Sequence, residues 1–234
     1  NSLALCHELS STDSRIKVIS IDKADLSTAR NEGVKVATGD YIAFVDSDDT
    51  VLPTLCEDTY NLAIKHNLGL VCFSLHKVYD NRADKYPYSN DGEIRVLSPK
   101  EMTILNLTDK SPAYVCTHLF RRDLFDTLSF PENIYYEDRA STFRFTAVCG
   151  KGAIINRSYY RYYCRNGSIS RSYGWKHFRD FAFANLCRLE FINQSGLFSK
   201  EEMASVASAS ADSFLRKLRH MLSKAKTPEQ RSEA

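Results

Sequence analysis

The residues of this 234-residue chain that could do chemistry include a short acidic cluster at Asp46, Asp48 and Asp49. The cluster directly follows residues 41–45, an apolar run that predicts a buried strand. In open α/β sheets, ligands bind at the carboxyl ends of strands, and carboxylates crowded there ionise together only near a cation. Hard oxygen ligands favour Mn²⁺ or Mg²⁺, held together with substrate phosphates. Asp46 and Asp48 are therefore candidate metal ligands.

Two other interpretations of the cluster need no bound phosphate. Asp49 or Thr50 could simply cap a helix that Pro53 opens. An EF-hand loop beginning at Asp46 fails, because its sixth position should be glycine and is Val51, and because Pro53 disrupts the loop.

A phosphatase of the haloacid-dehalogenase type is a further alternative. In such an enzyme Asp46 would form an aspartyl-phosphate and Asp48 would act as the general acid. That chemistry also requires a later Ser or Thr on a strand, a Lys and a second acidic pair, and the chain has no convincing set of them.

Residues 26–33 (Leu-Ser-Thr-Ala-Arg-Asn-Glu-Gly), followed by residues 37–49, closely resemble the family 2 glycosyltransferases, which have the GT-A fold. Arg30 lies in the first turns of a predicted helix, where its guanidinium and the free N–H groups could face a diphosphate. The alternative is a solvated helix arginine. By the resemblance, Asp46 contacts the sugar part of a nucleotide and Asp48 holds the metal that bridges the diphosphate.

The resemblance continues further along the chain. Residues 130–138 (Phe-Pro-Glu-Asn-Ile-Tyr-Tyr-Glu-Asp) resemble the family's later acidic motif, which implies that Asp138, next to Glu137, is the general base. Both acids would also be favourable at a helix start without any catalytic role. About ninety residues separate this pair from the first cluster, in the order that the family uses.

Residues 159–170 resemble the segment that follows the base in these enzymes. The resemblance implies that Arg165 offsets the charge of the leaving group and that Tyr162 or Tyr163 stacks on a sugar or base. An amphipathic edge strand with a turn at Asn166-Gly167 is the alternative.

Fewer residues of the sequence point to a site for the acceptor of the sugar. His118 falls where the resemblance places the acceptor, although a lone histidine can equally be structural. Residues 214–222 form an apolar stripe beside basic residues, which could rest on an anionic membrane near a lipid-linked acceptor or pack on its own domain. We expect the second.

The predicted elements alternate as strand, helix, strand, helix and strand over residues 15–21, 26–38, 41–45, 53–66 and 68–79. This alternation predicts an α/β fold with a mainly parallel sheet flanked by helices, and the resemblance implies that it is the GT-A (Rossmann-like) fold. Further predicted elements are helices at 99–107 and 137–149, a strand at 153–156 and a helical segment at 175–226. We divide the chain into a glycosyltransferase domain at 1–172 and a helical C-terminal extension at 173–234.

Residues 1–6 resemble the helix that follows the family's nucleobase-binding turn. We therefore expect the glycosyltransferase domain to be N-terminally incomplete. A sheet without its first strand exposes an edge that a second copy, in a homodimer, could cover.

Composition narrows the possible partners and compartment. A formal net charge of +2 gives no reason to expect nucleic acid, and no apolar run approaches the length of a membrane span. Seven cysteines without a CxxC pair predict reduced thiols in a cytoplasmic protein.

The resemblance implies an inverting glycosyltransferase that uses Mn²⁺ or Mg²⁺. It would move a sugar from a nucleoside diphosphate donor to a hydroxyl of a glycan or lipid-linked acceptor, as in polysaccharide synthesis. A non-catalytic remnant that only binds such a glycan is the alternative, and it predicts binding without turnover.

Overall fold

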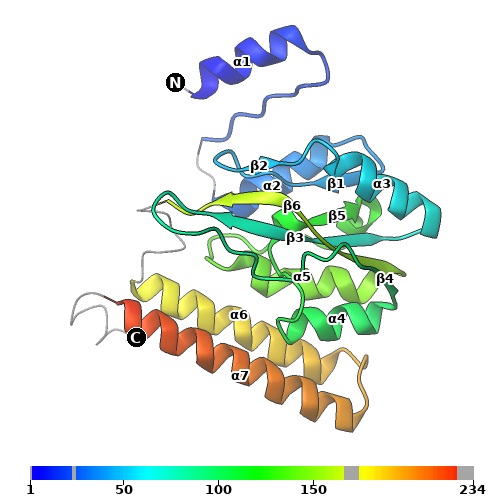
Figure 1. Ribbon diagram of the computed structural model, residues 1–234, viewed down its shortest axis with the longest axis vertical. Coiled ribbons are helices and arrows are strands. Elements are labelled where there is room, and N and C mark those ends of the chain that lie inside the picture. The colour runs from blue at the N-terminus through cyan, green and yellow to red at the C-terminus, as the bar shows by residue number, and fades with distance from the viewer. Residues whose placement is uncertain (1, 23–24, 166–173, 226–234) are drawn as a thin grey trace.

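The computed structural model describes residues 2–22, 25–165 and 174–225. One mixed sheet forms the middle layer, and helices cover both of its faces (Figure 1). A hairpin of two long helices forms a further layer beneath one of these faces. The helices are α1 (Ser2–Thr12), α2 (Leu26–Val36), α3 (Leu55–His66), α4 (Pro99–Leu107), α5 (Glu137–Val148), α6 (Trp175–Gln194) and α7 (Lys200–Lys224), with 3-10 turns η1 (Val115–Thr117) and η2 (Arg122–Asp126).

The strands are β1 (Tyr41–Ala43), β2 (Thr50–Val51), β3 (Leu70–Val78), β4 (Ile94–Leu97), β5 (His118–Arg121) and β6 (Gly152–Tyr163). Their order is β1-β5-β3-β6-β2, with β4 also paired to β6. Only β3 and β6 pair in parallel, and the other four pairings are antiparallel. The prediction of a mainly parallel sheet is therefore wrong. The short strand β5, which the sequence did not reveal, inserts between β1 and β3 and runs against both.

Some of the other predicted helices and strands are found in the structure, and others are not. The helix at 99–107 is found at those residues, because Ser98 and Glu101 form a capping box and Pro99 opens the first turn. The predicted strand at 15–21 is absent, since these residues form no ladder in the structure. The predicted helical segment from 175 is two helices, joined by a short turn at Gly196, whose φ is +66°.

Two cores fill the faces of the sheet. Phe73, Leu75 and Tyr160 pack with α3 on one face, and Cys72, Phe120 and Phe145 pack with α4 and α5 on the other. A third cluster, including Phe143 and Ile192, joins the helical hairpin to α5. The apolar stripe of α7, with Phe214 and Met221, packs against Phe181 of α6 and Tyr136, so it rests on its own domain as expected.

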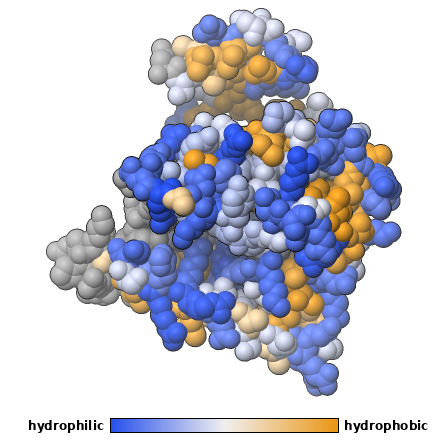
Figure 2. All heavy atoms as spheres, in the orientation of Figure 1, coloured by the Kyte–Doolittle hydropathy of each residue, from blue (hydrophilic) through white to orange (hydrophobic). Residues whose placement is uncertain are grey.

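Helix α1 stands apart from this body (Figure 1). It has no buried residue, and its side chains Leu3, Leu5 and Leu9 are exposed. Figure 2 shows apolar side chains gathered on this helix. Within the described ranges, no helix is long and apolar enough to span a bilayer, and the cysteines are free thiols.

Candidate active site

Arg30 on α2 links two acidic segments that lie far apart in the sequence. Its guanidinium donates to Glu137 Oε1 at 2.6 Å and to Asp46 Oδ1 at 3.2 Å. Its side chain is 8% exposed, so the ion pairs are largely shielded from water. Burial lowers the pKa of Arg30, but the charges of Glu137 and Asp46 outweigh it and raise the pKa above its usual value. The structure thus brings together three predicted site residues, Arg30, Asp46 and Glu137, which we call the Arg30 cluster.

Two neighbouring polar residues fix α2 in this position. Asp25 caps the helix by accepting from the Thr28 N–H at 2.8 Å, and the Asn133 N–H also donates to its carboxylate. The Asn31 side chain exchanges two hydrogen bonds with the Phe130 backbone, at 2.9 and 3.0 Å. Because Asn31 ties α2 to the segment before α5, Arg30 meets Glu137 in a fixed geometry.

The acidic loop is held at the carboxyl end of β6. The Tyr160 hydroxyl accepts from the Asp46 N–H at 3.0 Å and donates to Asp49 Oδ2 at 2.8 Å. The Tyr163 N–H donates to Asp49 Oδ1 at 2.8 Å. Helix α3 begins at Leu55 with no side-chain cap, so the capping interpretation of Asp49 is wrong. Asp49 instead fastens the loop to the sheet.

Asp48 is the carboxylate left open in this loop. Its side chain is exposed and has no hydrogen bond or ion pair with the described residues, while its backbone oxygen accepts from Arg165 at 3.1 Å. No three metal-binding side chains converge anywhere in the described ranges. A Mn²⁺ or Mg²⁺ ion that takes one carboxylate plus substrate phosphates fits such a site, since these ions rarely need a full protein cage.

Glu137 and Asp138 open α5 from a strained turn. Tyr136, directly before them, has φ +61° in the left-handed region, which is unusual for a bulky residue. The backbone N–H of Arg139 donates to Asp138 Oδ1 at 2.6 Å. Burial raises the pKa of Asp138, against the opposing charge of Lys217. Burial, with the charge of Asp138, also raises the pKa of Glu137 to about 7, although Arg30 opposes this.

A second buried ionic cluster, the Asp109 cluster, lies on the other side of Asp138. Asp109, after α4, accepts from Arg139 at 2.7 Å and from Arg188 of α6 at 3.0 Å. Ser213 of α7 donates to the same carboxylate, and Asn185 of α6 accepts from Arg139 at 2.9 Å. Burial raises the pKa of Asp109, but the charges of Arg188 and Arg139 outweigh it and lower the pKa to about 2. These contacts fix the hairpin to the start of α5.

The remaining candidates are His118 and the two tyrosines that end β6. His118 is buried, its Nδ1 lies 2.8 Å from the Tyr114 carbonyl oxygen, and burial lowers its pKa to about 4, which fits a neutral structural ring. Tyr162 and Tyr163 end β6, a strand inside the sheet and not at its edge. The predicted turn at Asn166-Gly167 lies outside the described residues.

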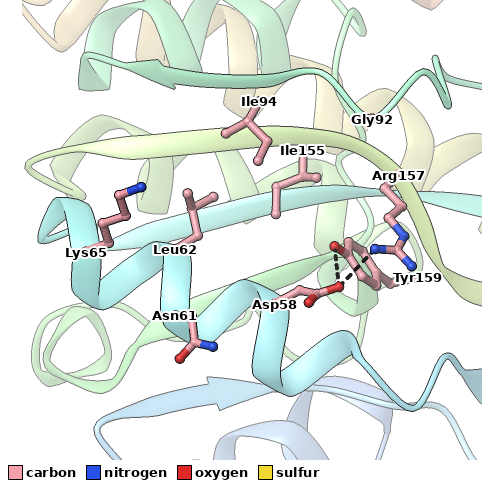
Figure 3. Close-up of a pocket in the computed structure, with 9 residues that line it drawn as sticks. All are labelled: Asp58, Asn61, Leu62, Lys65, Gly92, Ile94, Ile155, Arg157 and Tyr159. Atoms are coloured by element: carbon pink, nitrogen blue, oxygen red, sulfur yellow. Dashed lines mark hydrogen bonds and ion pairs between the residues drawn. The ribbon is translucent and has the colours of Figure 1, made fainter.

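A separate hollow of about 420 Å³ lies between α3, β4 and β6 (Figure 3). In it, the Asp58 carboxylate accepts from Arg157 at 3.0 Å and from the Tyr159 hydroxyl at 2.9 Å. None of the predicted site residues lines it. We therefore place the candidate active site at the acidic loop and the start of α5.

Comparisons with known proteins find similar sequences and a similar fold. The family described as Glycosyl transferase family 2 matches residues 1–129. Glycosyltransferase GlyG of Streptococcus pneumoniae serotype 4 is 27% identical over 183 residues, covering 74% of this chain and 60% of GlyG. The UDP-Glc:alpha-D-GlcNAc-diphosphoundecaprenol beta-1,3-glucosyltransferase WfgD of Escherichia coli is 29% identical over 123 residues, covering 51% of this chain and 44% of WfgD.

A likeness to a solved structure extends through the helical hairpin. The S. aureus TarS 1-349 structure in complex with UDP has a TM-score of 0.75 at 17% identity, covering 98% of this chain and 64% of that chain. At this identity the likeness shows a shared fold. The chain thus spans less than two thirds of the length of each of these relatives.

Proposed function

This chain belongs to glycosyl transferase family 2, and we propose that its site moves a sugar from a nucleoside diphosphate donor to an acceptor hydroxyl, with inversion at the anomeric carbon. The acceptor is a glycan, free or lipid-linked. The family match favours this transfer over the phosphatase alternative.

The proposal rests mainly on the position of Asp138. Its carboxylate is half-buried at the start of α5 and forms no ion pair with any described side chain, while its neighbours Glu137 and Arg139 are both paired. Its pKa is raised, first by burial, which improves it as a proton acceptor. In the proposed step it takes the proton of the acceptor hydroxyl as that oxygen attacks the anomeric carbon. The bond to the diphosphate breaks, and the diphosphate leaves with the electron pair.

The leaving group requires positive charge. Arg165, exposed and fixed to the backbone of Asp48, supplies a guanidinium next to the open carboxylate. A Mn²⁺ or Mg²⁺ ion on Asp48 would supply Lewis-acid neutralisation of the diphosphate. Asp46 stays a predicted contact for the sugar part of the nucleotide and for the metal. Arg30 reaches the diphosphate only from within its ion pairs, so we assign it to holding Asp46 and Glu137 in register.

A uridine nucleotide is the first donor to test. The relative WfgD is named for a UDP-Glc donor, and TarS was solved with UDP. Both names carry the same nucleotide, uridine diphosphate. We therefore propose a UDP-sugar.

Thermal unfolding with Mn²⁺ and a panel of nucleoside diphosphates tests this proposal. UDP at about 100 times its dissociation constant should add about 2.7 kcal/mol to the free energy of unfolding and raise the midpoint. Asp48→Ala should abolish that shift. The matched control is Asp123→Ala, since Asp123 is also exposed and, among the described residues, pairs with Arg121 alone.

A folded protein whose midpoint responds to no nucleotide would contradict the proposed donor site. Binding without hydrolysis or transfer from UDP-glucose or UDP-GlcNAc, over a set of glycan acceptors, would favour the non-catalytic remnant. Transfer that retains the anomeric configuration would contradict the inverting step alone.

A further inference from the structure

The helical hairpin exposes large apolar side chains near the start of α6. Trp175, Phe183 and Leu186 are 51%, 47% and 62% exposed. With Arg179 between the first two, these side chains follow one another at intervals of four, four and three residues, so they form one stripe along the helix. Leu215 of α7 is exposed as well. Apolar side chains gathered on one exposed stripe indicate an interaction surface.

Basic side chains lie among these apolar ones. Lys176 and Arg179 belong to the exposed side of α6, and Arg216 and Arg219 belong to the exposed side of α7. Arg179 pairs with Asp180 at 2.7 Å. The guanidinium groups of Arg216 and Arg219 form no hydrogen bond or ion pair within the part of the chain that the structure describes. These two arginines are therefore open to an anionic partner.

The packing of the hairpin brings the two exposed sides together. The ring of Phe181 on α6 stacks on that of Phe214 on α7, with 5.4 Å between the centroids, and Phe178 and Met221 join the same buried cluster. Since the two helices run antiparallel (Figure 1), residues 175–186 lie beside residues 214–225. We call the exposed side chains within these two ranges the hairpin face.

Charge is segregated along the hairpin. Within residues 175–186 and 214–225 the one acid is Asp180, which is 1% exposed. The rest of α6 and α7 carries four acids, Glu190, Glu201, Glu202 and Asp212. The hairpin face is therefore basic and free of exposed carboxylates, so it attracts an anionic surface at this end of the hairpin.

The hairpin face lies close to the candidate active site. The inner side of α6 contacts the turn that precedes Asp138, because Asp180 accepts from the Tyr135 N–H at 2.9 Å. The ring of Phe181 also packs on that of Tyr136, with 5.2 Å between the centroids. An α-helix with its side chains is about 10–12 Å across. A surface resting on the outer side of α6 would thus lie roughly one helix diameter from this turn.

The combination of side chains favours a membrane over a soluble anion. Tryptophan is enriched at the level of the lipid headgroups, and lysine and arginine near the surface attract anionic lipids. A soluble polyanion would engage the charges and leave Trp175, Phe183 and Leu186 in water. The apolar stripe at residues 214–222 faces the domain, so a different set of side chains forms the hairpin face.

We propose that the hairpin face docks the protein on an anionic membrane surface, with Trp175 and Phe183 at the level of the headgroups. The docking itself does not depend on the proposed function. The acceptor does rest on that function: it is then the lipid-linked glycan, whose hydroxyl reaches Asp138 from the membrane.

Vesicle binding by the full chain tests the docking. Trp175 is the one tryptophan of the chain, so its emission reports on the hairpin face directly. Vesicles of phosphatidylglycerol and phosphatidylcholine in equal parts are compared with phosphatidylcholine alone. The anionic vesicles should bind at least about tenfold more tightly, and less so as salt rises. The emission of Trp175 should shift to shorter wavelength on binding, and brominated lipid should quench it.

Variants of exposed residues identify the surface. Arg216→Gln with Arg219→Gln should weaken binding to the anionic vesicles about twentyfold, since each basic side chain near such a surface contributes about fivefold. The matched control is Lys65→Gln with Lys151→Gln, which removes the same charge from exposed positions on α3 and before β6 and should leave binding unchanged. Phe183→Ser should weaken binding at low and high salt alike.

Three results would overturn the docking proposal. The first is equal affinity for the two kinds of vesicle, and the second is an equal loss of binding in the lysine control. The third is binding to heparin as tight as to anionic vesicles without a shift of the Trp175 emission, which would assign the charges to a soluble polyanion.

The docking proposal and the proposed function fail separately, because vesicle binding is measured without nucleotide and UDP stabilisation without vesicles. Vesicle binding without a UDP response would leave the hairpin face in place and contradict the donor site. The reverse result would overturn the docking and leave the transferase proposal standing. For the acceptor, the double arginine variant should slow transfer to glycans anchored in anionic vesicles and leave transfer to the same free glycans unchanged. Equal rates of the variant and the unaltered chain on both would overturn the lipid-linked assignment.

Discussion

The Arg30 and Asp109 clusters are mirror images in charge, and they meet on three successive residues of α5. In the first, one arginine lies between two carboxylates, at 2.6 and 3.2 Å. In the second, one carboxylate lies between two arginines, at 2.7 and 3.0 Å. Glu137 belongs to the first cluster and Arg139 to the second, so Asp138 lies at their junction.

The difference shows that three successive residues at the start of one helix can separate a region of excess negative charge from a region of excess positive charge. The Arg30 cluster carries an excess negative charge, next to the loop where a cation and a diphosphate are proposed. The Asp109 cluster carries an excess positive charge and fixes the helical hairpin. Because Glu137 and Arg139 are paired, they leave Asp138 as the carboxylate of α5 that is free to exchange a proton.

The largest expected effect comes from removing the carboxylate at the junction. Asp138→Asn keeps the shape and loses the proton acceptor, so kcat for transfer should fall by about 10² to 10⁴. UDP binding should change little, because Asp138 lies outside the acidic loop. Steady-state rates and UDP-induced thermal shifts measure the two quantities. Full turnover by this variant would mean that another group accepts the proton.

A smaller effect should follow from breaking the Asp109 cluster. Asp109→Asn leaves two buried arginines without a counter-charge, and we expect a loss of about 3 kcal/mol in the free energy of unfolding. Asp123→Asn is the matched comparison: its pair with Arg121 has a similar 2.8 Å distance but is 54% exposed on the acid side. That variant should lose less than about 0.5 kcal/mol. Urea unfolding at pH 7 measures both. Similar losses would remove the distinction between buried and surface pairs.

The smallest effect is a pH dependence that differs between the clusters. The pKa of Glu137 is raised from 4.5 to about 7 in the folded state. The folded chain therefore binds more protons than the unfolded chain between these values, and stability falls as pH rises through them, on the order of 2 kcal/mol. The pKa of Asp109 is lowered from 3.8 to about 2, so its contribution is present above pH 4 and is lost as pH falls towards 2.

Glu137→Gln separates these two contributions. In urea unfolding from pH 4.5 to 7.5 without divalent metal, the variant should lose the first slope. Its loss of stability below pH 4 should remain, because Asp109 is untouched. An unchanged slope between pH 4.5 and 7 in the variant would assign that titration to a different group.

Local signals in the sequence were sufficient for some elements and failed for others. The capping box at Ser98 and Glu101 fixed the start of α4, and the apolar run at β3 was found at nearly its true length. Strand β5 was missed because its four residues carry no local pattern. Its insertion between β1 and β3 depends on pairings with residues far away in the chain.

The site shows the same division. The sequence identified Arg30, Asp46 and Glu137, and the structure places them in contact. It did not identify Asp109, which pairs with arginines 30 and 79 positions away. A signal for Arg188 was nonetheless present: it falls at helical spacing with Phe181 and Ile192, on the buried face of α6. An arginine on an apolar helix face requires a buried partner.

The Asp109 cluster bears on whether the helical hairpin is a portable module. The cluster joins Asp109, after α4, and Arg139 of α5 to three polar residues of the hairpin. These are Asn185, Arg188 and Ser213. A chimera that replaced the hairpin with another helical pair of the same apolar pattern would leave Asp109 and Arg139, next to Asp138, without these polar partners. A working chimera would therefore need those three polar residues together with the apolar face that surrounds them.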